Sequence, residues 1–150
     1  MLHILLAAHL VLFAFSLAFT AGLGILQSRV ARSGDVQKIH DLFSACRPLS
    51  MTGGIGWLVT AALGLGLAQT AGYDLTASWL IWSYGLFALF LAVGFGIHAP
   101  YQAKVIAASA GGVMTPQLQH LLKAPLERAA GAASAVAVIG IVWLMTSRMG

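Results

Sequence analysis

Residues 2–26 read LHILLAAHLVLFAFSLAFTAGLGIL and contain no Lys, Arg, Asp or Glu. About 20 helical residues cross the hydrocarbon core of a bilayer, so this stretch is long enough to span it once. Three more uncharged apolar stretches follow, at residues 49–70, 76–99 and 129–146. The pattern predicts an all-α, polytopic membrane protein: a bundle of four transmembrane helices running up and down, with residues 1–150 forming a single membrane domain.

The composition excludes a water-soluble globular protein. Hydrophobic residues make up 59% of the chain and charged residues 8%, whereas soluble domains carry about 25% charged residues. The formal net charge is +4, but the basic residues flank apolar spans, where they anchor to lipid headgroups. We therefore expect the lipid bilayer, and not a nucleic acid, as the partner of these charges. The single Cys46 excludes an intramolecular disulfide.

The basic residues also predict the orientation. Seven of the eight lie in the connections 27–48 and 100–128, and the eighth is Arg148. Because short cytoplasmic loops are enriched in Lys and Arg, both connections should face the cytoplasm and both termini should lie outside (N-out/C-out). The chain is short, poor in loops and without a targeting extension, which favours the bacterial plasma (inner) membrane.

Both basic connections contain signals for short cytoplasmic interfacial helices. Asp35 is suited to cap an amphipathic helix that ends before Pro48, the expected start of span two. Thr115 and Pro116 predict the N-terminus of a second short helix. Pro100 should end or kink span three.

Pro125 is expected to begin span four. Glu127 falls in its first turn, where the helix dipole favours a carboxylate. We interpret Glu127 as a helix-capping charge and not as a catalytic acid.

Small residues recur at four-residue spacing on every span and predict close helix packing. The longest stripe lies on span two and consists of Thr52, Gly56, Thr60, Gly64 and Ala68. The shorter stripes are Ala14, Ala18 and Gly22 on span one; Gly85, Ala88, Ala92 and Gly96 on span three; and Ala129, Ala133 and Ala137 on span four. A second small face on span four, with Gly131 and Ala135, could serve another membrane protein subunit or a homo-oligomer.

Span one also carries a polar line, formed by His9, Ser16, Thr20 and Gln27. At 100° per residue these positions fall within about 20° of His9, nearly opposite the small residues. One interpretation is a cofactor site for haem b or a quinone, or a proton path, because polar groups inside a membrane are often functional. The other is hydrogen bonding between helices.

Two further groups of residues are candidate ligands. His98, at the inner end of span three, lies about 25 Å from His9 along the membrane normal, so the two cannot bind one metal or haem together. His3, Met145 and Met149 lie at the outer end and suit Cu(I), if spans one and four are neighbours. His40 and His120 are expected to be solvated or interfacial.

The layout resembles small bacterial four-helix inner-membrane proteins of uncharacterised function, and more loosely the copper-resistance D-like and haem-linked protoporphyrinogen oxidase families. Three features carry the resemblance: Leu2-His3-Ile4-Leu5 opening span one, Pro48 with the glycine-rich segment from Gly53 to Gly66, and Trp79-Leu80 opening span three. Resemblance to the oxidase implies a haem on His3 or His9. The uncharacterised group is the nearest fit and implies no reaction.

These observations favour a non-enzymatic accessory or structural subunit that associates with other membrane helices. No carboxylate lies within a span and no phosphate-binding or metalloprotease motif occurs, so catalytic residues are not predicted. A haem b- or quinone-binding redox protein using the His9 face is the alternative. A small-molecule or copper transporter is the third interpretation.

Overall fold

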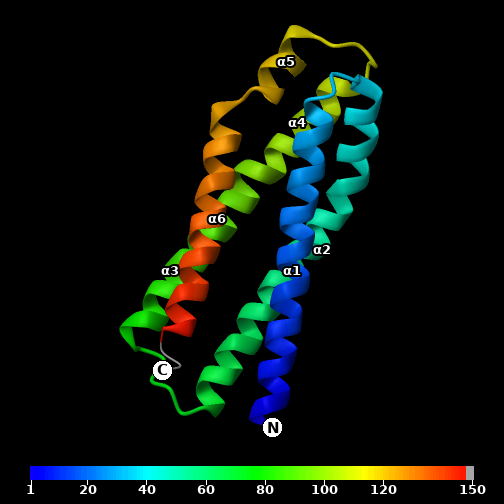
Figure 1. Cartoon of the computed structure of the whole chain (residues 1–150). Helices are drawn as coiled ribbons and strands as arrows, with labels where there is room; N and C mark the ends of the chain where they lie inside the picture. Colours follow the sequence, from blue (N-terminus) through cyan, green and yellow to red (C-terminus); the bar gives the residue numbers. More distant parts are fainter. Residues whose placement is uncertain (148–150) are drawn as a thin grey trace. The chain divides into compact units, whose positions relative to one another are not determined.

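The computed structural model describes residues 1–147, which form helices and no strand (Figure 1). The elements are α1 (Leu2–Ala31), α2 (Val36–Thr70), α3 (Ser78–Val93), the π-helical η1 (Gly94–His98), α4 (Ala99–Ser109), α5 (Pro116–Leu122) and α6 (Pro125–Thr146). Four helical segments are long and apolar enough to cross a membrane: Leu2–Ala31, Val36–Thr70, Ser78–Ser109 and Pro116–Thr146. The all-α, four-span class is therefore confirmed, whereas the N-out/C-out orientation stays a prediction.

The chain divides into two compact units. The first comprises Met1–Asp74 and Ser109–Met114, and the second comprises Leu75–Ala108 and the described residues from Thr115 onward. Each unit is built around one pair of long helices. The prediction of a single membrane domain over residues 1–150 stays a prediction.

In the first unit α1 and α2 form an antiparallel hairpin, joined by a short turn after Ala31 (Figure 1). The contacting residue pairs show the antiparallel register: along the interface the residue numbers rise on α1 and fall on α2. His9 contacts Thr60, and Ser16 lies against Gly56. Nearer the turn, Thr20 lies beside Gly53. The hairpin therefore joins both helices over most of their length.

The segment before Pro48 is not a separate interfacial helix, which corrects the sequence prediction. It is the first part of α2, which runs without a break for 35 residues with Pro48 inside it. A proline removes one backbone hydrogen bond, but the other bonds of a long helix keep it continuous. At 1.5 Å per residue α2 is about 52 Å long, so it extends beyond a hydrocarbon core of about 30 Å.

Pro100 distorts the third span without ending it. The five residues of η1 immediately precede α4, and the helix continues to Ser109. A π-turn widens the helix by one residue, which relieves the clash between a proline ring and the preceding turn. Of the two predictions for Pro100, that it ends span three or that it kinks it, the first is therefore wrong.

The predicted helix starts at Asp35, Thr115 and Pro125 are confirmed, whereas the one at Pro48 is wrong. The side chain of Asp35 accepts a hydrogen bond from the backbone N–H of Lys38 at 3.1 Å, and this bond holds the pKa of Asp35 below its usual range. Thr115 accepts from the N–H of Leu118 in the same way and begins the separate helix α5. Pro125 occupies the first turn of α6, as expected.

The small-residue stripe of α2 packs closely against another helix, as predicted, except at its N-terminal end, and that helix is α1. Gly56 and Thr60 are buried, but Thr52 is exposed and Gly53 is buried in its place. A Cβ atom added at Gly56 would lie 2.5 Å from Ser16 Oγ. Glycine is thus required at position 56 for this close approach of the two helices.

The small-residue stripes of α1 and α3 do not form the interfaces within the units, contrary to prediction. Ala14 and Ala18 are exposed, and the opposite, polar side of α1 faces α2. On the third span the whole predicted stripe is exposed: Gly85, Ala88 and Ala92 of α3, and Gly96 of η1. Leu86 instead packs over Gly140 of α6, where an added Cβ would lie 2.9 Å from Leu86 Cδ1. One small residue at each contact is enough for close packing. The other helix can then contribute a larger or polar side chain to the same contact.

We expect Gly56→Ala to destabilise the hairpin by about 1–3 kcal/mol, because the added methyl group overlaps the Ser16 hydroxyl. The measurement is thermal or denaturant unfolding in lipid nanodiscs. Gly66→Ala is the matched control, since nothing lies within 4 Å of a Cβ at that position.

Ser16→Ala should rescue Gly56→Ala, because Ser16 Cβ would remain at an ordinary distance of 3.6 Å. Equal stability of the Gly56 and Gly66 variants would contradict this interface.

Candidate functional site

His9 of α1 lies in the interface with α2 and is 8% exposed. Its Nδ1 lies 2.9 Å from the carbonyl oxygen of Thr60. A carbonyl only accepts, so Nδ1 must carry the proton, and in the neutral ring Nε2 keeps a lone pair. The imidazole edge lies over Gly64, where a Cβ would come within 3.0 Å of Cε1. The glycine of the α2 stripe therefore makes room for the ring.

Thr20 and Ser16 continue this polar line toward the middle of the hairpin. The indole N–H of Trp57 donates to Thr20 Oγ1 at 2.9 Å, and Thr20 donates to the Ser16 carbonyl at 2.7 Å. Phe13 meets the Trp57 ring edge-on at 5.5 Å. Ser16 is fully buried, and its hydroxyl has no hydrogen-bond partner among the described residues. Trp57 is thus a second cross-helix donor beside His9, which sequence reasoning did not identify.

Gln27 ends the polar line near the turn of the hairpin, where its side chain lies close to the thiol of Cys46. Cys46 is 2% exposed. Among the four members of the line, His9 and Thr20 form hydrogen bonds with α2, and Ser16 and Gln27 lie against it. The geometry matches hydrogen bonding between helices, one of the two interpretations left open by the sequence.

The second unit contains a different polar cluster, centred on His98 at the end of η1. His98 Nδ1 lies 2.6 Å from Glu127 Oε1 in the first turn of α6. On the other side of the ring, Nε2 lies 3.5 Å from Ser134 Oγ. The second carboxylate oxygen, Glu127 Oε2, is buried and has no hydrogen-bond partner in the described part of the chain. Glu127 is therefore both a first-turn acid of α6 and the partner of an imidazole on the preceding span.

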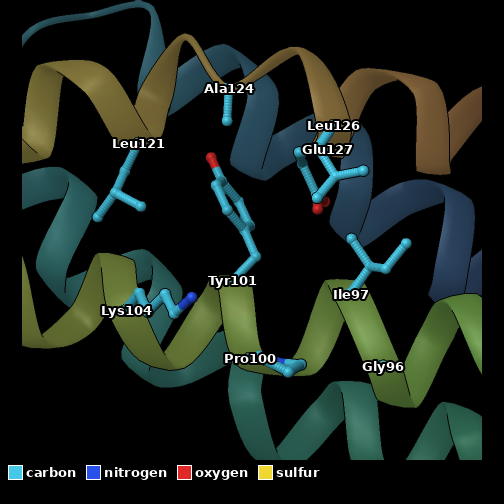
Figure 2. A pocket seen from close by; sticks show the side chains of 9 residues that line it. All are labelled: Gly96, Ile97, Pro100, Tyr101, Lys104, Leu121, Ala124, Leu126 and Glu127. Carbon is cyan, nitrogen blue, oxygen red and sulfur yellow. The ribbon is translucent and has the colours of Figure 1, made fainter.

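A partly open cavity of about 170 Å³ adjoins this cluster (Figure 2). Glu127 and the aromatic ring of Tyr101 project into it from opposite helices, and Lys104 lies one turn beyond Tyr101 (Figure 2). The remaining walls are mainly apolar and consist of Gly96, Ile97, Pro100, Leu121, Ala124 and Leu126. The cavity thus combines a carboxylate, an ammonium group and a phenol with a hydrophobic lining.

Comparison with known protein families agrees with a membrane protein. Residues 1–149 match the model of DUF2269, described as a predicted integral membrane protein. The chain belongs to this family. No curated protein and no solved structure matches the chain. The family match supports the resemblance to uncharacterised membrane proteins, but not the looser one to the copper-resistance and oxidase families.

In this DUF2269 protein the predicted copper ligands are not brought into one described site. His3 is exposed in the first unit, Met145 is half-buried in the second, and Met149 lies outside the described residues. Residues 1–147 contain no group of three His, Cys, Asp or Glu side chains that could hold a metal ion. Copper binding at His3, Met145 and Met149 stays a prediction.

The two connection histidines differ from each other. His120 is exposed, as expected. His40 is half-buried, and its Nδ1 lies 3.2 Å from Ser109 Oγ, so it is not simply solvated.

The sequence did contain a signal for the His98–Glu127 pair. Consecutive spans of an up-and-down bundle run antiparallel, so the end of one lies beside the start of the next. Applied to spans three and four, this rule places His98 near Glu127. Pro100 indicates an irregular helix beside His98, but nothing in the sequence shows that the imidazole faces α6.

Replacing Trp57 by Phe should destabilise this DUF2269 protein by about 0.5–1.5 kcal/mol, because Thr20 loses its cross-helix donor while the apolar ring is kept. Trp82→Phe is the control, since Trp82 is 68% exposed. Unfolding in nanodiscs followed by circular dichroism measures both variants, and equal losses would exclude a specific role for the indole N–H.

Proposed function

We propose that this DUF2269 protein is a non-enzymatic accessory or structural subunit that associates with other membrane helices. One observation carries the proposal: α1 and the third span expose close-packing faces that the two helix pairs do not use. On the third span, nothing lies within 4 Å of a Cβ added at Gly85 of α3 or Gly96 of η1, and Ala88 and Ala92 are exposed between them. Such stripes let backbones of neighbouring membrane helices approach each other.

The polar residues of α1 support the same function. His9 and Thr20 have hydrogen-bond partners on α2, and Gln27 lies against it, so the line serves the internal stability of the hairpin. The basic connections suit the positive-inside rule, and we infer a multi-pass protein of a bacterial plasma membrane. Packing, and not chemistry on a substrate, is then the role that the helix faces fit best.

Association should be lost when a large side chain fills the α3 stripe. Ala88→Leu is expected to reduce the mass of the complex extracted in lipid particles, measured by mass photometry or native mass spectrometry. Ala132→Leu is the matched control, because Ala132 is exposed on α6 outside the predicted small-residue faces.

A wild-type particle that contains one copy of the 15.6 kDa chain and no second protein would contradict the proposal. A homo-oligomer that Ala88→Leu dissociates would identify the partner as a second copy.

A second candidate function rests on the tautomer of His9. Histidine ligands of metals usually donate their other ring N–H to a carbonyl or carboxylate, as His9 does to Thr60. Nε2 then offers the lone pair that a haem b iron requires. A quinone carbonyl accepts hydrogen bonds, and Nε2 has no proton to donate in this tautomer. Only the reduced quinol, whose hydroxyl group donates, therefore fits this nitrogen.

If His9 binds haem, the purified protein should show a Soret band that His9→Ala removes. His3→Ala is the control, because His3 is exposed near the N-terminus. An absorption spectrum without this band, together with no extractable quinone, would reject the redox candidate.

A further inference from the structure

The cavity in the second unit is lined by Glu127, whose carboxylate has hydrogen-bond donors for only one of its two oxygens among the described residues. Glu127 Oε1 accepts from His98, but Oε2 has no donor among the described residues. A carboxylate oxygen withdrawn from water needs a hydrogen-bond donor or a cation. The terminal torsion of a glutamate turns easily, so either oxygen can face the cavity that its side chain lines.

The opposite wall of the cavity carries the complementary charge. Lys104 lines the cavity from α4, and Tyr101 stands between it and Glu127 (Figure 2). An ammonium on one side and a carboxylate on the other favour a ligand that itself carries both signs of charge. Ile97 and Leu126 provide apolar contact beside these groups.

The cavity lies at the level of the lipid headgroups. From Ser78 to His98 the third span rises about 30 Å, which is the thickness of the hydrocarbon core. Tyr101 and Lys104 follow within the next two turns. On the neighbouring helix Glu127 lies in the first turn of α6, where that span begins.

We propose that this cavity binds the zwitterionic headgroup of an aminophospholipid from the leaflet on the basic side of the membrane. The primary ammonium group donates to the carboxylate of Glu127, the phosphodiester pairs with Lys104, and the acyl chains leave along Ile97 and Leu126. Binding of this lipid would supply a donor to Glu127 Oε2, which has none among the described residues.

Other membrane ligands fit the same groups less well. An anionic lipid without an amine brings a negative charge toward Glu127 and supplies no cation for it. A choline headgroup has the right charge but no N–H, so it cannot donate a hydrogen bond. A quinone offers only acceptors and leaves Glu127 Oε2 without a donor.

The test is binding of short-chain phosphatidylethanolamine, phosphatidylcholine and phosphatidylglycerol to the full-length protein, measured by native mass spectrometry. We expect the ethanolamine lipid to bind about tenfold more tightly than the choline lipid, which corresponds to one charge-assisted hydrogen bond. Equal binding of these two lipids by the wild-type protein would overturn the proposal, and this comparison needs no variant that could fail to fold.

Two variants assign the binding to the two charges. Glu127→Gln should abolish the preference for ethanolamine over choline, whereas Lys104→Gln should weaken both lipids equally. Lys123→Gln is the control, because Lys123 is exposed and does not line the cavity. Retention of the full preference in Glu127→Gln would overturn the proposal.

Soluble glycerophosphoethanolamine separates a lipid from a free polar ligand of the same chemistry. It should compete poorly, because it lacks the acyl chains that contact the apolar wall. Competition as strong as that of the intact lipid would overturn the assignment to the membrane.

Discussion

The hydrogen bond between His9 and the carbonyl of Thr60 illustrates the constraint on which this structure depends. Inside a bilayer no water replaces a missing partner, so each polar group must find one within the protein or bind a ligand. In the α1–α2 hairpin His9 and Trp57 follow this rule by reaching across a glycine-containing face, whereas the buried Ser16 hydroxyl has no partner among the described residues. The register of the hairpin is set by the hydrogen bonds of the His9 imidazole and the Trp57 indole across the interface. The small residues of α2 provide the space for this close approach.

The second helix pair meets the same constraint differently. Its contact between α3 and α6 is mainly apolar, with Leu86 over Gly140, and its polar groups gather at one end. There η1 presents His98 to Glu127, and one carboxylate oxygen has no donor among residues 1–147. A helix irregularity, an ionisable pair and a cavity therefore coincide at this end of the helix pair. This coincidence, and not the polar line of α1, makes the second unit the place to look for a bound molecule.

Sequence reasoning found the four spans and most helix starts, but it placed a start at Pro48 that does not exist and chose the wrong faces for two helices. Ala14 and Ala18 have the spacing typical of a close-packing stripe, yet the buried side of α1 is the opposite one. Spacing shows which residues share a face, but it does not show which face a neighbour covers. Similarly, Pro48 marks a common helix start, but its effect depends on the length of regular helix on either side.

The sequence by itself determined the number of spans, the all-α class and the capping residues, because these depend on local properties: the length of an uncharged run and the chemistry of a single turn. Only the tertiary structure decided which faces meet, that Trp57 bonds Thr20, and that His98 pairs with Glu127. Those contacts join residues 29 to 37 positions apart along the chain. Their partners depend on helix register and on the π-turn, which no local pattern specifies.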